Sequence, residues 1–323
     1  MKKIGCVAAI GVLAALFMHA VPSLAQTWPQ RPVKFILPLG PGAGADIGAR
    51  LFADQLARRW GQPVVVENRP GADGIIAINA VIAARDDHTL FWGPSSTFIG
   101  HPYTLDKLPY DPAELVPVAR VTNTVVAIAI PASLNAGSLK DLMALARAQP
   151  GKLNFASVTA ATDIIFAGYF RRAGLELQKI SYKDTVTALN DLVEGRIHLY
   201  AAAYAIVRAQ AQSGRVKLLA VTNRTRVAGL DLPTVAEAGF PELNFDGLVG
   251  LIASRSSGIN DAARERIAAD VKAVAAEPVV SARLIATAQI ISPGSGAELA
   301  ASISEQAANL AATAKVLGLK PKF

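Results

Sequence analysis

Three glycines within five positions stand between an apolar run and a helix-like segment, in the stretch PLGPGAGADIGAR at residues 38–50. The apolar run VKFIL precedes it, and ARLFADQL continues the helix-like pattern after it. Such a strand–turn–helix arrangement can bind an anion. Glycines let backbone N–H groups approach a ligand, and the first-turn N–H groups of a helix are unpaired at the positive end of its dipole.

Three interpretations of this turn remain open on these residues alone. The first is a nucleotide site, because Gly40, Gly42 and Ala45 satisfy the dinucleotide pattern G-x-G-x-x-A. Glu67 then ends the next apolar run, where a ribose-binding acid would stand. The second is a carboxylate site built from backbone amides. The third is a purely structural turn, in which the side chain of Asp46 accepts hydrogen bonds from first-turn amides.

The rest of the chain offers no pattern of catalytic or metal-binding residues. His88, His101 and His198 stand apart, without the His-x-x-x-His or Glu-x-x-His spacing of a metal site, so we expect packing or surface roles. No G-x-S-x-G nucleophile elbow occurs. Cys6, the only cysteine, lies in the N-terminal apolar stretch, which excludes thiol chemistry and disulfides from the remainder. We therefore expect no metal, no cofactor and no enzymatic activity.

The N-terminus has the composition of a secretory signal. Lys2 and Lys3 precede an apolar stretch, and the small residues Ser23 and Ala25 predict cleavage before Gln26. We therefore expect residues 1–25 to be removed and the mature protein to lie in the periplasm. The formal charge of +7 comes from scattered basic residues. That distribution argues against nucleic acid as a partner and suits the capture of anionic solutes.

Strand-like and helix-like segments alternate through two parts of the chain, at about residues 33–93 and 138–221. Alternation of this kind predicts parallel sheets covered by helices. Apolar passages at about 120–130 and 245–252 are predicted to cross between two lobes. Helix-like stretches at 260–275 and 296–315 would then return to the first lobe. A ligand cleft is expected between the lobes.

Several motifs, taken together, resemble the periplasmic substrate-binding proteins of tripartite tricarboxylate transporters, the Bug receptors. In order along the chain they are WPQRPVKFILPLGPGAGADIGARL, GQPVVVENRPGADG, LFWGPSSTFIGHP, KLPYDPAELVPVA, QPGKLNFAS, SYKD, SGRVKLLAVTNRTR and LPTVAEAGFPEL. The resemblance implies an α/β, two-lobed type II periplasmic binding-protein fold, each lobe a mostly parallel sheet flanked by helices. The expected division is a signal peptide at 1–25, lobe 1 at 26–125 plus 247–323, and lobe 2 at 126–246.

The resemblance also implies which residues bind a ligand. Two strand-to-helix turns, one per lobe, would hold a carboxylate mainly through backbone amides and hydroxyl groups, and a further segment would line the cleft. The expected ligand-binding residues are Gly42, Ala43, Gly44, Ala45, Asp46, Ser95, Thr97, Ser157, Thr159, Ala161, Thr162, Asp163, Asp184 and Tyr204. The implied partners are a small organic acid and a two-component inner-membrane permease. We expect the receptor to be a monomer.

Departures from the family pattern bear on the choice of ligand. Ala160 and Ala161 replace glycine or serine in the second turn, and Phe98 replaces a usual histidine. Asp184 replaces a usual glycine, and alanines before Tyr204 replace a frequent acid. These changes predict a less polar distal pocket, and hence an aromatic or apolar monocarboxylate as ligand. The competing hypothesis is an exported, dehydrogenase-like enzyme that binds a nucleotide at the first glycine turn.

Overall fold

The computed structural model describes residues 28–182 and 184–322. The expected signal peptide, including Cys6, and also Lys183 lie outside the described residues. The chain from Arg31 onward forms one compact unit, and the fold given below is that of this unit. Within the described ranges, no helix combines the length and the apolar character that crossing a membrane requires.

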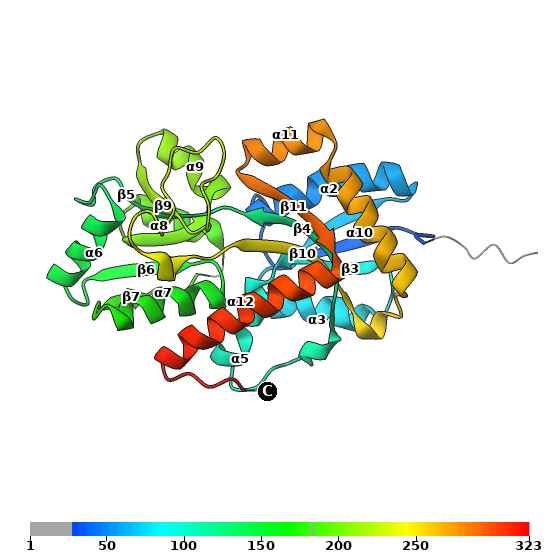
Figure 1. Cartoon of the computed structure of the whole chain (residues 1–323), viewed down its shortest axis with the longest axis horizontal. Coiled ribbons are helices and arrows are strands. Elements are labelled where there is room, and N and C mark those ends of the chain that lie inside the picture. Colours follow the sequence, from blue (N-terminus) through cyan, green and yellow to red (C-terminus); the bar gives the residue numbers. More distant parts are fainter. Residues whose placement is uncertain (1–27, 183, 323) are drawn as a thin grey trace, which may run out of the picture. The chain divides into compact units, whose positions relative to one another are not determined.

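The strands form two separate sheets, one of six strands and one of five (Figure 1). The six-stranded sheet has the order β11 (Gln289–Ser295), β4 (Leu115–Thr124), β10 (Gly247–Ser254), β3 (Thr89–Pro94), β1 (Val33–Leu37) and β2 (Val64–Asn68). The five-stranded sheet has the order β7 (Leu177–Lys179), β6 (Leu153–Ser157), β8 (Leu199–Ala203), β5 (Val126–Pro131) and β9 (Val216–Val221).

Helices flank both sheets. They are α2 (Gly44–Trp60), α3 (Ile75–Ala84), α4 (Ser96–Ile99), α5 (His101–Thr104), α6 (Leu139–Ala148), α7 (Ala160–Arg172), α8 (Thr185–Val193), α9 (Tyr204–Gln212), α10 (Asp261–Ala275), α11 (Pro278–Ala286) and α12 (Gly296–Val316). Single 3₁₀ turns are η1 (Ala72–Gly74), η2 (Pro112–Glu114), η3 (Pro241–Leu243) and η4 (Arg255–Ser257). Side-chain caps start several helices, as Ser138 does for α6 and Ser295 for α12.

The expected two-lobed α/β fold is confirmed, but the sheets are mixed rather than mostly parallel. β1 pairs in parallel with β2 and β3, whereas β10 runs antiparallel to β3 and β4. The chain leaves the first sheet at the end of β4 and enters the second sheet directly in β5. No helix turns the chain back at this crossing. The strand β5, which enters the second sheet, and the strand β10, which returns to the first, therefore pair antiparallel with their neighbours.

Uninterrupted apolar runs in the sequence become the buried centre of the molecule. Every residue of β10 is buried, as a central strand covered on both faces requires. α12 contacts β4 of the first sheet and also α7 beside the second sheet (Figure 1). The contact with α7 is close, because a Cβ atom at Gly168 would lie 2.4 Å from Cγ2 of Thr313. The last long helix therefore packs against both lobes.

Candidate ligand-binding site

Residues of both lobes line a main cavity of about 700 Å³. Its first-lobe side is made by the end of β1, by the segment 70–74 and by Thr97, and its second-lobe side by the ends of β6 and β7 and the starts of α7 and α8. The lining residues with polar side chains are Asp73, Thr97, Thr104, Ser157, Thr159, Asp163, Lys179, Ser181, Tyr182, Asp184, Thr185 and Tyr200. A cavity of this size and polarity suits a small polar solute.

A second, smaller pocket of about 50 Å³ adjoins the main cavity, because Leu39, Val158 and Thr159 line both. The first and second strand-to-helix turns both border it. The lining residues are Leu39, Ala43, Gly44, Ala45, Pro94, Ser96, Thr124, Val126, Val158, Thr159, Thr162, Ala201, Ala203, Ile206, Phe245 and Gly247. We call it the small pocket. Its volume suits a single group such as a carboxylate, with the remainder of a ligand in the main cavity.

The start of α2 supplies unpaired donors to the small pocket. Within the described ranges, no residue accepts a hydrogen bond from the backbone N–H of Gly44 or of Ala45, the first two residues of α2. The hydroxyl oxygen of Thr124 is buried at the same pocket and likewise has no hydrogen-bond partner among the described residues. A Cβ atom at Gly44 would lie 2.9 Å from Cγ2 of Thr124, so the close approach of strand and turn requires glycine here. Buried donors without a partner are expected where a ligand completes the site.

Asp46 holds the first turn in shape and does not line either cavity. Its buried carboxylate accepts hydrogen bonds from the amide of Gly42 at 2.9 Å, from Arg50 Nε at 3.1 Å and from Asn68 Nδ2 at 2.9 Å. Burial raises the pKa of Asp46, but these hydrogen bonds outweigh burial and hold the pKa below its ordinary value. The hydrogen bond from Gly42 to this carboxylate also fixes the backbone conformation of the turn at Gly42, where the φ of 82° favours glycine.

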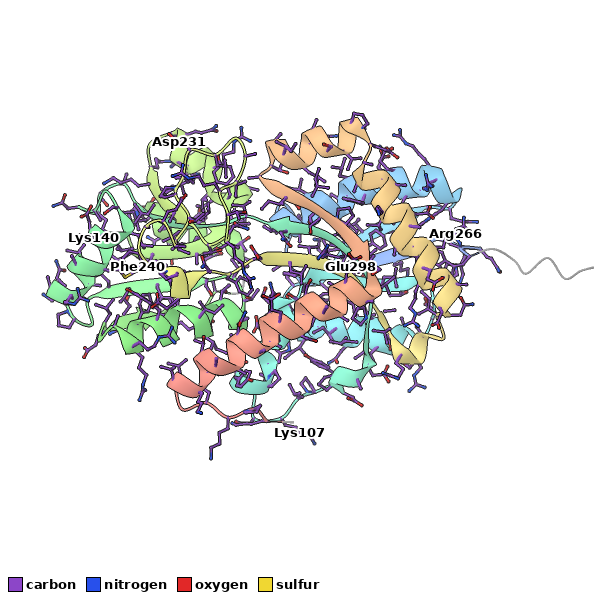
Figure 2. The ribbon with its side chains drawn as sticks, in the orientation of Figure 1. Lys107, Lys140, Asp231, Phe240, Arg266 and Glu298 are labelled. Atoms are coloured by element: carbon purple, nitrogen blue, oxygen red, sulfur yellow. The ribbon has the colours of Figure 1, made fainter. Side chains whose placement is uncertain are left out.

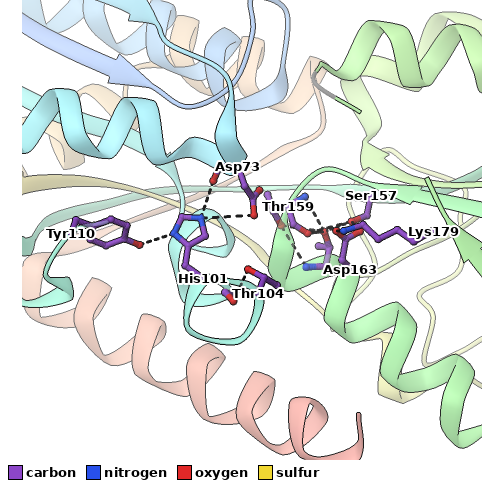
Figure 3. Close-up of polar contacts among 10 residues, drawn as sticks. Asp73, His101, Thr104, Tyr110, Ser157, Thr159, Asp163 and Lys179 are labelled. Carbon is purple, nitrogen blue, oxygen red and sulfur yellow. Dashed lines mark hydrogen bonds and ion pairs between the residues drawn. The ribbon is translucent and has the colours of Figure 1, made fainter. Parts of the chain in front are cut away.

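The second turn is a capping box at the start of α7. The Thr159 side chain accepts from the amide of Thr162, and the Thr162 side chain accepts in return from the amide of Thr159. Ser157 Oγ donates to the carboxylate of Asp163 at 2.7 Å, and Asp163 forms an ion pair with Lys179 (Figure 3). Thr159, rather than Thr162, is therefore the N-cap residue, and the turn is organised mainly by its own side chains.

Asp73 brings a carboxylate from the first lobe to the start of α7 (Figure 3). Its carboxylate lies near the backbone N–H of Ala160, the first residue of that helix, and this amide favours the ionised form. Burial and the neighbouring Asp163 carboxylate raise the pKa of Asp73 to about 7, although Lys179 and the Ala160 amide act in the opposite direction. The main cavity therefore contains an acid whose charge changes near neutral pH.

His101 fixes the backbone of Asp73. It is fully buried, and its Nε2 donates to the carbonyl oxygen of Asp73 at 2.9 Å, while Nδ1 accepts from the hydroxyl of Tyr110 at 2.7 Å. Burial lowers the pKa of His101, so the ring is neutral and matches this donor–acceptor pattern. In the described parts of the chain, no cluster of acidic, histidine or cysteine residues could hold a metal ion.

The structure brings most, but not all, of the expected ligand-binding residues to these cavities. Those at the main cavity are Thr97, Ser157, Thr159, Asp163 and Asp184. Those at the small pocket are Ala43, Gly44, Ala45, Thr159 and Thr162. Those at neither are Gly42, Asp46, Ser95, Ala161 and Tyr204.

The reasons for these last placements are local. The amide of Gly42 donates to Asp46, and the Ser95 hydroxyl donates to Gln306 of α12. Ala161 is fully buried, with its amide close to Gly100. Tyr204 packs its ring in apolar clusters. Local hydrogen bonds and packing therefore keep these residues away from the two cavities.

Charged and polar side chains line the main cavity together with apolar residues such as Leu39, Pro70 and Val158. Phe98 lies outside it and packs edge-on against Phe91, with ring centroids 6.3 Å apart. The hydroxyl of Tyr182 donates to Asp191 at 2.6 Å. Asp184 caps α8 through the Thr187 amide. The expected aromatic or apolar body of the ligand therefore stays a prediction.

Sequence reasoning missed Asp73, Lys179 and Thr124 as candidates. The only signal for Asp73 was its place between glycines in the stretch PGADG, and nothing local distinguished the other two. For the nucleotide hypothesis, Glu67 accepts from Arg69 at 2.6 Å and lies outside both cavities. The acid that would bind a ribose is therefore not at the site.

Two lobes that share a polar cavity, with helix N-termini bordering it, define the class of periplasmic binding proteins. A family model described as the tripartite tricarboxylate transporter family receptor matches residues 48–317. The chain belongs to this receptor family. A relative from Bordetella bronchiseptica, described only as a UPF0065 protein, is 31% identical over 319 residues, covering 96% of this chain and 92% of the relative. BugT of Bordetella pertussis is 33% identical over 241 residues, covering 73% and 74% of the two chains.

Solved structures agree with this assignment. A protein of R. palustris, solved with adipate, is 27% identical, with a TM-score of 0.84, and the match covers 91% of this chain and 100% of that one. A structure described as a periplasmic transporter is also 27% identical, with a TM-score of 0.83, covering 91% and 99% of the two chains. The fold of BugD is similar as well, with a TM-score of 0.80 at 24% identity, covering 92% and 100%.

Proposed function

We propose that this protein is a periplasmic receptor that binds an organic carboxylate between its lobes and delivers it to a tripartite transporter permease, without catalysis. The observation that carries the proposal is the set of unpaired donors at the small pocket, namely the amides of Gly44 and Ala45 and the hydroxyl of Thr124. The membership of the receptor family and the adipate named with one similar structure support a carboxylate as ligand.

The physical basis for affinity is the charge of the ligand. A carboxylate in the small pocket would accept two backbone hydrogen bonds at the positive end of the α2 dipole, where anions are stabilised. Charge-assisted hydrogen bonds of this kind are stronger than neutral ones, and the apolar walls of the pocket strengthen them further. The lobes, which we assign to residues 26–125 with 247–323 and to 126–246, would close around the ligand and present the closed shape to the permease.

The substitution Thr124→Val tests the site with two opposite effects. Valine has the shape of threonine but no hydroxyl, so it removes a buried polar atom that has no partner among the described residues. The free energy of unfolding should stay the same or rise by about 1 kcal/mol. Affinity for adipate or hexanoate, measured by calorimetric titration, should fall about fivefold to tenfold because a ligand hydrogen bond is lost.

The matched control is Thr89→Val. Thr89 is buried in the same sheet, and its hydroxyl donates to Asp86 at 3.2 Å outside both cavities. This variant should lose about 1 kcal/mol of stability and keep the wild-type affinity. Unchanged affinity in Thr124→Val, with carboxylate binding intact, would remove the small pocket from the proposal.

A further inference from the structure

We propose that Asp73 sets the charge of the accepted ligand, selecting one with a single carboxylate and a neutral or cationic far end, and rejecting a dicarboxylate of the same length. This inference rests on the proposed function and deepens it. It concerns the end of the main cavity beyond the small pocket, where Asp73 meets the start of α7 (Figure 3).

Asp73 occupies the place where a second ligand carboxylate would be stabilised. The N-terminus of α7 is the second helix start at the cleft, and the Asp73 carboxylate lies near its first amide, that of Ala160. The side chain of Thr159 accepts a hydrogen bond from the third amide, that of Thr162. The backbone of Gly100 packs against the amide of Ala161, because a Cβ atom at Gly100 would lie 2.7 Å from that nitrogen. A second ligand carboxylate at this helix start would therefore have to approach the Asp73 carboxylate.

The charges around Asp73 do not balance. Among the described residues, Asp73 and Asp163 face one ammonium group, that of Lys179, and Lys179 is already paired with Asp163. His101 is neutral, because its full burial lowers the pKa of the ring, although the hydrogen bond to the Asp73 carbonyl acts in the opposite direction. The hydroxyl of Tyr110 is neutral too, since burial and the Asp73 charge raise its pKa. The described residues therefore give this end of the cavity an excess of negative charge, which repels an anion and attracts a cation.

Asp184, another acid that lines the main cavity, does not offset the excess negative charge. Both oxygens of Asp184 are taken by Thr187, whose amide and hydroxyl donate at 2.8 and 2.9 Å. Those hydrogen bonds lower the pKa of Asp184 and keep it ionised. Asp184 thus adds a further negative charge to the wall that a dicarboxylate would have to approach.

The backbone holds Asp73 in an unusual conformation to achieve this placement. Positive φ angles occur at four successive residues, with values of 120°, 46°, 53° and 88° from Gly71 to Gly74. A non-glycine residue at positive φ is strained, and such strain concentrates at functional sites. A Cβ atom at Gly74 would lie 2.2 Å from Cγ2 of Thr97, so the segment also packs too closely to shift easily.

Three ligands of equal chain length and different charge test the inference. Calorimetric titration at pH 8, where Asp73 is ionised, should give adipate an affinity at least about tenfold below that of hexanoate. The zwitterion 6-aminohexanoate should bind at least as tightly as hexanoate. In Asp73→Asn, which tolerates the same backbone conformation, adipate should gain about tenfold and 6-aminohexanoate should lose its advantage. Asp73→Gly, which removes the whole side chain and accepts a positive φ, should favour adipate at least as much as Asp73→Asn does.

The dependence on pH supplies an independent readout. Lowering the pH from 8 to 6 protonates Asp73, whose pKa is about 7, so wild-type affinity for adipate should rise while that for hexanoate changes little. Asp73→Asn should abolish this rise. The control is Asp231→Asn, which removes an exposed carboxylate far from both cavities and should leave the order of the three ligands unchanged (Figure 2).

The outcomes separate this inference from the proposed function. Equal wild-type affinities for adipate and hexanoate, unaltered in Asp73→Asn, would overturn the role of Asp73 and leave the carboxylate receptor intact. Failure of all three acids to bind the wild type and the variants would overturn both. Selectivity that changes in Asp231→Asn as much as in Asp73→Asn would assign the effect to net charge and not to this site.

Discussion

At the scale of single residues, two aspartates near the cleft have opposite electrostatic surroundings. Asp46 is buried among Arg50, Asn68 and the Gly42 amide, which favour its ionised form. Asp73 faces another carboxylate, which favours its protonated form. The first therefore stabilises the turn that binds the ligand, whereas the second is available to discriminate between ligands.

We predict that Asp46→Asn lowers the free energy of unfolding at pH 7 by about 1.5–3 kcal/mol, because a buried network of charge-assisted hydrogen bonds is lost. The pKa of Asp46 is lowered in the folded protein, so its contribution is present above the unfolded-state pKa. It is lost as the pH falls through the folded-state value. Urea unfolding of both proteins from pH 7 to pH 3 should therefore show a difference that shrinks toward acid.

Asp54→Asn is the control for this prediction. Asp54 pairs with Arg58 four residues later on the same helix, as Asp46 pairs with Arg50, but both members of the Asp54 pair are exposed. Its loss should cost less than about 0.5 kcal/mol. Equal effects of the two substitutions would show that the carboxylate of Asp46 does not organise the first turn.

At the scale of elements, the sequence predicted the strand-to-helix units well and their side chains less well. The apolar runs at β1 and β6, each followed by a turn and a helix, correctly located both turns of the cleft. The direction of a side chain after such a turn depends on the first helical residue, which shifted Ala161 and Tyr204 away from the cavities. Each residue along a helix rotates the side-chain direction by about 100°. A sequence pattern places the start of a helix only to within a residue or two, so it does not fix which side chains face the cavity.

The contribution of Asp73 could not be predicted, since it depends on contacts between distant parts of the chain. Its carboxylate meets Ala160 and Asp163 only after β4 and β5 have carried the chain into the second lobe. The left-handed turn of η1 that directs it there is not specified by any local propensity, because Ala72 and Asp73 rarely adopt positive φ.

We predict that Thr159→Ala weakens both the helix and the site. Removing the N-cap hydroxyl of α7 should lower stability by about 1 kcal/mol. Because Thr159 lines both cavities, carboxylate affinity should also fall several-fold. Thr159→Ser, which keeps the hydroxyl, should restore most of both losses in thermal unfolding and calorimetry.

The control is Ser138→Ala at the start of α6, where the Ser138 hydroxyl caps the Asp141 amide at 3.1 Å, outside both cavities. Ser138→Ala should lower the free energy of unfolding by about as much as Thr159→Ala does and leave the affinity for the carboxylate unchanged. A loss of affinity of equal size in Ser138→Ala would contradict a specific role for the second turn, because it would then follow from global destabilisation.

At the scale of the whole molecule, charge and packing suit a receptor for small anions. Among the described residues, the exposed basic residues Lys107, Lys140 and Arg266 lie at separate places on the molecule (Figure 2). α12 packs against β4 and α7, so a change in the arrangement of the lobes must involve this helix. A ligand that contacts both turns would favour the closed arrangement by its extra contacts there.

The central claim is that a ligand carboxylate is held by the first two amides of α2. The most direct measurement is an NMR titration of protein labelled with ¹⁵N at glycine and alanine, with hexanoate as the added acid. The claim predicts saturable downfield shifts that are largest at the amide protons of Gly44 and Ala45, because these donors have no acceptor among the described residues of the free protein. Saturable binding that leaves both amides unmoved would contradict it.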